Sequence, residues 1–185
     1  MTDAVGQRLT GRLPGLHLND IGRTQATGLP ERLSRWRIDA IYSSPLERAV
    51  ETATPFSERS GLPILTDIAF AEFDYGRWSG KPIGELEQTE EWRRFVRLRS
   101  CSPAPGGELI TEVQTRIVTA LWQLAGTHPD QIVAVFSHAD AIKAALLHFL
   151  GAPADNIVRM DIQPASISVV RLSEVGPMVL SVNLT

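Results

Sequence analysis

The sequence predicts an α/β fold in which a mostly parallel sheet is covered by helices on both faces. Short apolar runs of strand length alternate along the chain with longer stretches of helical periodicity, the order expected of βαβ units. The clearest strand is residues 132–136, Ile-Val-Ala-Val-Phe, because a nearly unbroken apolar run is typical of a parallel strand buried on both faces. At 185 residues the chain is long enough to bury a substantial core, so we expect a single domain over residues 1–185.

The other elements follow from turn signals and from periodicity. A helix over residues 20–35 contains Gly28 and Pro30, which predict a kink or a break inside it. The longest helix is expected over 109–125, where apolar residues recur at helical spacing. A further helix over 141–150 ends before a glycine, a common stop signal. The remaining expected elements are a helix over 45–60 and strands over 39–42, 63–66, 167–172 and 178–183.

Composition and charge exclude several classes of partner. The net charge is −3 and no run of lysine or arginine occurs, so we expect no nucleic-acid partner. The single cysteine, Cys101, excludes an internal disulfide and fits a reducing compartment. No apolar run reaches the length of a membrane span, and the N-terminus lacks a signal-peptide pattern. We therefore expect a cytoplasmic protein with no membrane partner. The densest basic cluster, expected on the solvated face of a helix, is Arg93, Arg94, Arg97 and Arg99.

The stretch Ser-Ser-Pro-Leu-Glu-Arg-Ala over residues 43–49 has the pattern of an anion site. Ser44 stands where it can cap a helix that begins at Pro45, and Glu47 lies three residues after the cap, as in a capping box. The free N–H groups of a helix start favour a negative group. Arg48, one turn in, adds donors that match the geometry of a phosphate. The motif alone leaves two interpretations open, a phosphate site and an ordinary helix start.

Two further residues can complete such a site. His138 directly follows the 132–136 strand, and ligands of open α/β sheets gather at the carboxyl ends of strands. Arg48 follows another strand in the same way, so the two side chains can converge on one anion. Glu72 lies among aromatic residues and glycines, and partial burial there would suit a general acid. The alternatives are a packing or surface histidine, and a solvated carboxylate in a loop that covers the sheet edge.

Five motifs occur in order along nearly the whole chain. They are Gly11-Arg12…Leu18…Gly22…Gln25-Ala26, then Ser43-Ser44-Pro45-Leu46-Glu47-Arg48-Ala49…Glu51-Thr52-Ala53, then Glu72…Gly76…Trp78…Gly80, then Pro105-Gly106-Gly107-Glu108, and Ser137-His138. Together they resemble the histidine phosphatase superfamily, on its phosphoglycerate-mutase-like branch. The resemblance implies a three-layer α/β/α sandwich around a mixed sheet, with a pocket that holds a small-molecule phosphomonoester without metal or other cofactor. It also implies that Arg48 clamps the phosphate, that His138 stabilises the transferring group, and that Glu72 passes a proton to the leaving oxygen. Arg12 is expected to bind substrate beside them.

One motif that the resemblance leads us to expect is absent from the sequence. The first strand of the family lies centrally in its sheet and ends in Arg-His-Gly, whose histidine is the nucleophile, and this motif does not occur here. Thr2 fits a position three residues after that histidine. About five buried apolar residues at roughly 1.5–3 kcal/mol each make such a strand worth on the order of 10 kcal/mol, comparable with a whole domain's net stability. We therefore expect Met1 to be an internal methionine of a longer protein. His17, His128 and His148 do not follow strands and are not expected to replace the nucleophile.

The expected activity of the full-length protein is phosphomonoester hydrolysis through a phosphohistidine intermediate, while the chain over 1–185 is expected to be inactive. Two alternatives stay open. A mutase-type phosphotransferase is disfavoured because the segment from Gly80 to Pro105 is short. A non-catalytic phosphate-binding or regulatory protein follows if Met1 is the true start. Val5 and Ala139 depart from the asparagine and glycine that are common in relatives, so the identity of the substrate is not predicted.

Overall fold

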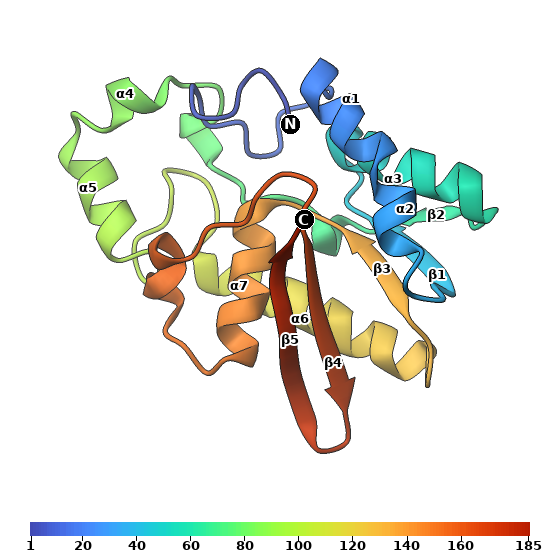
Figure 1. The fold of residues 1–185 in the computed structure, drawn as a ribbon. Coiled ribbons are helices and arrows are strands. Elements are labelled where there is room, and N and C mark those ends of the chain that lie inside the picture. Colours follow the sequence, from blue (N-terminus) through green and yellow to red (C-terminus); the bar gives the residue numbers. More distant parts are fainter.

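A computed structural model describes residues 1–185. Its centre is a parallel sheet of three strands in the order β2-β1-β3, formed by β1 (Ala40–Ser43), β2 (Ile64–Thr66) and β3 (Val133–Phe136) (Figure 1). Ile41 lies opposite Ile64 on one side and opposite Ala134 on the other. The strands predicted over 39–42, 63–66 and 132–136 are therefore confirmed, each within a residue of its predicted ends.

The helices also follow the prediction closely. The expected break in the first one occurs at Gly28, which ends α1 and precedes α2. The helix that follows β1 begins at Glu47, two residues later than the sequence predicts. The bounds are α1 Asp20–Thr27, α2 Leu29–Leu33, α3 Glu47–Ser60, α4 Ile83–Leu86, α5 Glu90–Arg97, α6 Ile110–Thr127 and α7 Ala139–Phe149, with short 3₁₀ helices η1 Ile68–Phe70, η2 Gly76–Trp78 and η3 Ala154–Arg159. None of the helices is long and apolar enough to cross a membrane.

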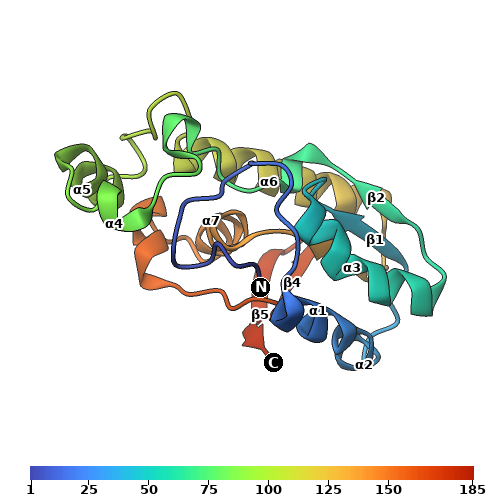
Figure 2. The same cartoon turned by 90° about the horizontal axis from the view of Figure 1, so that it is seen from above.

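Two apolar clusters bury the two faces of the sheet, which accounts for the three layers. On one face Ile41 packs with residues of α2 and α3. On the other face the neighbouring residue Tyr42 packs against a larger cluster that includes α6 and α7. Figure 2 shows α1, α2 and α3 on one side of the strands and α6 on the other. The expected α/β/α architecture is therefore confirmed.

The sheet differs from the prediction in its continuity. The last two strands, β4 (Ile167–Ser173) and β5 (Gly176–Leu184), pair antiparallel with each other and with no other strand. The three parallel strands and the antiparallel hairpin therefore form two separate sheets in this chain, where the resemblance implies a mixed sheet whose first central strand is missing. Residues of both β3 and β4 line a cavity of about 930 Å³.

Candidate active site

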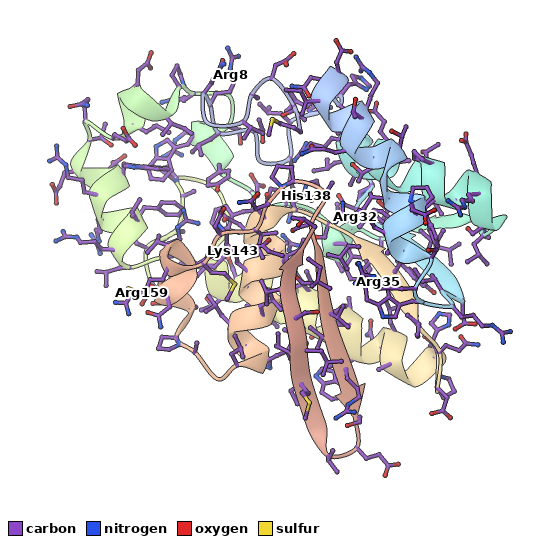
Figure 3. The ribbon with its side chains drawn as sticks, viewed as in Figure 1. Arg8, Arg32, Arg35, His138, Lys143 and Arg159 are labelled. Atoms are coloured by element: carbon purple, nitrogen blue, oxygen red, sulfur yellow. The ribbon has the colours of Figure 1, made fainter.

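The three candidate catalytic residues each follow one of the three parallel strands. Arg48 lies in the first turn of α3 after β1, Glu72 follows β2 and η1, and His138 caps α7 directly after β3. Because the strands are parallel, their carboxyl ends share one edge. The structure brings all three side chains to the wall of a single cavity there. Figure 3 shows His138 near the centre of the molecule, at the start of α7.

Arg48 presents an unpaired group to this cavity. Its Nη2 donates to the backbone carbonyl of Gly11 at 2.8 Å, whereas its Nη1 is buried without any hydrogen-bond partner. Burial lowers the pKa of the Arg48 guanidinium, although the charges of Glu72 and Glu47 oppose that shift. A buried cation is costly unless it is paired, so an anion at Nη1 would be strongly favoured.

His138 lies beside that cation and is held in the neutral form. Its Nε2 lies 2.7 Å from the hydroxyl oxygen of Ser44, and only 8% of the residue is exposed. Burial, followed by the charges of Arg48 and Arg116, lowers the pKa of His138 to about 3. At neutral pH the ring is therefore uncharged and can exchange a hydrogen bond with an incoming oxygen at little desolvation cost.

Ser44 does not cap a helix as predicted. Its hydroxyl bonds His138 and accepts from the N–H of Leu46 at 3.2 Å, and its own N–H donates to the carbonyl of Phe136 at 2.8 Å in the β1–β3 ladder. The predicted capping box is wrong as well, because the carboxylate of Glu47 accepts from Gly15 N–H at 2.9 Å instead. Ser44 thus stays hydrogen-bonded to β3 just past the end of β1, and the helix begins only at Glu47.

Glu72 has the properties of a proton donor near neutral pH. Its Oε1 accepts from the N–H of Phe73 at 2.9 Å. Burial, followed by the negative charge of Asp140, raises the pKa of Glu72 to about 7. A carboxyl with that pKa carries a proton about half of the time at pH 7, which suits general acid catalysis and, after transfer, general base catalysis.

Two arginines hold the backbone of Glu72 in place. Its carbonyl accepts from Arg12 Nε and from Arg116 Nη2, each at 3.0 Å. Both guanidinium groups also pair with Glu108, at 2.7 and 3.1 Å respectively. Arg12, which the sequence predicts to bind substrate, is therefore engaged with protein partners and is not among the residues that line the cavity. Glu108 belongs to the Pro105-Gly106-Gly107-Glu108 motif, but its link to these two arginines has no signal in the sequence.

Glycines allow the same loop to pack this closely. A Cβ on Gly107 would lie 2.2 Å from the carbonyl oxygen of Asp74, and one on Gly76 would lie 2.5 Å from the backbone at Gly106. Gly76 also has a positive φ of 51°, which other residues adopt only at a cost. The Gly106-Gly107 pair is thus required by backbone contact with the loop that carries Glu72.

A second buried ion cluster lies next to Glu72. Asp140 accepts from Arg99 Nη1 at 2.8 Å and from the hydroxyl of Tyr75 at 2.7 Å, and Lys143 lies 3.5 Å away. The expectation that Arg99 lies on a solvated helix face is therefore wrong. Arg99 follows the end of α5 and its side chain turns inward, because Asp140 supplies a buried counter-charge; the helix residue Arg97 is exposed, as expected.

The other histidines are engaged with other side chains or lie in solvent, although His128 lines a part of the same cavity. His17 is exposed and pairs with Glu51, and His128 bonds the hydroxyl of Tyr42 and the side chain of Gln131. His148 is exposed near the end of α7. No group of three or more His, Cys, Asp or Glu side chains is arranged to hold a metal ion.

The fold and the site define a three-layer α/β protein with a pocket, lined by Arg48, Glu72 and His138, at the carboxyl edge of its parallel sheet. The model of the histidine phosphatase superfamily (branch 1) matches residues 1–185. The chain therefore belongs to this superfamily, and the predicted resemblance is confirmed.

Relatives of known structure and function agree with this assignment. The chain is 32% identical over 180 residues to phosphoserine phosphatase 1 of Hydrogenobacter thermophilus, covering 95% of this chain and 85% of that protein. It is 32% identical to a glucosyl-3-phosphoglycerate phosphatase of Mycolicibacterium vanbaalenii, covering 82% and 71%. The solved structure of a mycobacterial glucosyl-3-phosphoglycerate phosphatase superposes with a TM-score of 0.89 at 26% identity, covering all of this chain and 95% of that one.

Proposed function

We propose that the protein hydrolyses small phosphomonoesters at the pocket formed by Arg48, Glu72 and His138. The observation that carries the proposal is the buried, unpartnered Nη1 of Arg48 beside a neutral histidine and a carboxyl with a pKa of about 7. Relatives support the same chemistry, because those named above are phosphatases. The mycobacterial relative has also been solved with VO3 and with inorganic phosphate.

Each residue has a distinct part in the proposed reaction. Arg48 and His138 hold the non-bridging oxygens of the phosphoryl group while charge builds up on them, the electrostatic term that dominates phosphoryl transfer. A histidine nitrogen attacks phosphorus as the ester P–O bond breaks, and Glu72 gives its proton to the departing alkoxide oxygen. Glu72 then takes a proton from water, which attacks the phosphohistidine and releases phosphate.

We further propose that the attacking histidine comes from outside residues 1–185. His17 and His128 have other partners and His148 is exposed, whereas His138 is the expected stabiliser of the transferring group. Arg12 would act mainly through the loop that carries Glu72, and substrate contact by Arg12 stays a prediction. The one exposed, free cysteine, Cys101, is compatible with the reducing cytoplasm, where we propose that the enzyme acts.

The test is release of phosphate from p-nitrophenyl phosphate. It compares the 185-residue chain with a longer chain that also contains the residues encoded in frame just upstream of the Met1 codon. Turnover by the extended chain alone supports hydrolysis with a nucleophile outside residues 1–185. Turnover by the shorter chain refutes that placement. Inactivity of both, with phosphate still bound, favours the alternative of a phosphate-binding protein. Transfer of the phosphoryl group to a second hydroxyl instead of water would identify a mutase.

Variants of the active form test the residues. Arg48→Ala and His138→Ala should each lower kcat/KM at least about a hundredfold, the loss typical for removal of one group that stabilises the transition state. Arg93→Ala is the matched control, because Arg93 is exposed on α5, and it should leave turnover within about twofold. Circular dichroism of each variant separates lost chemistry from lost folding. Full activity in Arg48→Ala would refute the proposed pocket.

A further inference from the structure

A buried carboxylate that has no part in the proposed reaction lies next to the proton donor. Asp140 belongs to the first turn of α7, two residues after His138, and only 8% of it is exposed. Its Oδ2 accepts from the hydroxyl of Tyr75 at 2.7 Å and from Arg99 Nη1 at 2.8 Å, and its Oδ1 lies 3.5 Å from Lys143 Nζ. Burial alone would raise the pKa of Asp140, but these partners outweigh it and lower that pKa. The carboxylate is therefore ionised at neutral pH.

The contacts of Asp140 join three segments that are distant in the sequence. Tyr75 stands three residues after Glu72 in the same loop, and Arg99 follows the end of α5. The guanidinium of Arg99 is itself held over the ring of Phe95, 4.6 Å from the ring centre. A carboxylate bonded by donors from two other segments has little freedom to move. Asp140 therefore fixes the loop of Glu72 against the start of α7.

Asp140 also acts on the carboxyl of Glu72. Burial and the negative charge of Asp140 both favour the protonated form of Glu72. Arg48 of α3 favours the ionised form, and so do the N–H groups of Phe73 in the same loop and of Ala141 on α7. Without Asp140, burial alone would oppose these three groups, and Glu72 would release its proton at a lower pH.

Stability is a weak reason for placing the Asp140–Arg99 pair in the interior. The cost of removing two ions from water offsets most of the attraction between them. The Nε of Arg99 is also buried without any hydrogen-bond partner, and an unsatisfied buried donor is costly. The fold therefore gains little from the pair, whereas the proton donor beside it gains a fixed negative charge.

We propose that Asp140 is a positioning residue for the proposed phosphatase reaction: it holds the loop of Glu72 against α7 and keeps Glu72 in the protonated form that donates to a leaving alkoxide. The inference rests on the proposed function, in which Glu72 is the proton donor. Asp140 itself neither gives nor takes a proton. Donation matters most for esters of ordinary alcohols, because an unprotonated alkoxide is a poor leaving group. An aryl ester such as p-nitrophenyl phosphate releases a stable phenolate and needs the proton far less.

The test measures the pKa of Glu72 by ¹³C NMR titration of its carboxyl carbon in the protein and in three variants. Asp140→Asn removes the charge beside Glu72 and should lower the proton affinity of Glu72 at least about tenfold. Arg99→Gln breaks the same ion pair but leaves that charge in place, so the proton affinity should stay equal or rise. The double variant, Asp140→Asn with Arg99→Gln, removes both partners of the buried pair and so avoids the unpaired guanidinium that destabilises Asp140→Asn. It should lower the proton affinity at least about fivefold.

The two single variants separate this role from a purely structural one. If the cluster only supports the fold, Asp140→Asn and Arg99→Gln break the same pair and should change the pKa of Glu72 alike. Equal changes in the two variants overturn the proposal, and so does an unchanged pKa in the double variant. Asp161→Asn is the matched control, because Asp161 is exposed, and it should leave the pKa of Glu72 where it is.

A second readout compares two substrates of the active form at pH 8. Above its pKa, the protonated fraction of Glu72 is proportional to its proton affinity. The ratio of kcat/KM for β-glycerol phosphate to kcat/KM for p-nitrophenyl phosphate should therefore fall at least about fivefold in the double variant, but not in Arg99→Gln. Equal losses with both substrates overturn the proposal. The expected NMR shifts in a protein without turnover would support the action of Asp140 on Glu72 and refute the proposed function instead.

Discussion

Glu72→Gln is expected to stabilise the protein in alkaline solution while abolishing the proton transfer that we propose for Glu72. Burial and Asp140 raise the pKa of Glu72 from 4.5 to about 7, so the folded state binds this proton more tightly than the unfolded state does. Stability therefore falls as the pH rises from 4.5 through 7. A tenfold change in proton affinity is worth about 1.4 kcal/mol, so the ionised carboxylate costs the folded protein about 3 kcal/mol at pH 8. The neutral amide of glutamine avoids this cost.

Urea denaturation at pH 4 and pH 8 measures this difference. At pH 4 the parent and Glu72→Gln should have nearly equal free energies of unfolding, because Glu72 is protonated in both of the parent's states. At pH 8 the variant should be more stable by about 3 kcal/mol. Glu58→Gln is the control, since Glu58 is exposed on α3, and it should show no such pH dependence. Equal stability of parent and Glu72→Gln at pH 8 would refute the buried, proton-binding environment inferred here.

The remaining predictions concern neighbouring groups. Burial lowers the pKa of His138 to about 3, so the parent protein loses stability as the pH falls from 6.5 toward 3. His138→Gln has no such proton to bind. Between pH 7.5 and pH 4 its free energy of unfolding, measured by urea denaturation, should therefore fall by about 3 kcal/mol less than that of the parent. Gly107→Ala places a Cβ against backbone and should lower the thermal midpoint, whereas Gly126→Ala, inside α6 with open space around it, should raise stability by about 0.5–1 kcal/mol. Asp140→Asn leaves the buried guanidinium of Arg99 without its carboxylate partner. This should lower the free energy of unfolding, measured by urea denaturation, by about 3–5 kcal/mol. A decrease below about 1 kcal/mol would mean that water reaches Arg99.

The sequence predicts the elements well because their signals are local. The apolar run that forms β3, the periodicity of α6 and the break at Gly28 all depend on residues within a few positions of one another. The order of motifs also identifies the three residues that the structure brings to one cavity. Arg48 and His138 follow predicted strands, and in the structure Glu72 follows a strand too. Their chemical roles, and the single domain over residues 1–185, stay predictions.

What the sequence does not predict depends on partners far along the chain. Ser44 has a typical capping sequence, but its hydroxyl is taken by His138, 94 residues away. In the sequence Arg99 looks like the exposed arginines before it, but in the fold its side chain is buried against the carboxylate of Asp140, 41 residues later. In each case a local propensity is overridden by a tertiary contact.

The two perturbed pKa values have a common consequence for the charge of the pocket. Burial opposes charge on both side chains, so His138 is neutral at pH 7 and Glu72 is protonated in about half of the molecules. Arg48 keeps its positive charge beside them, and its Nη1 lacks a partner. A phosphoryl dianion entering there would pair with that cation and would make protonation of both neighbours easier. In the proposed reaction these groups would together hold an anion and supply a proton to it, although ionisation of Glu72 at high pH and protonation of His138 at low pH destabilise the fold.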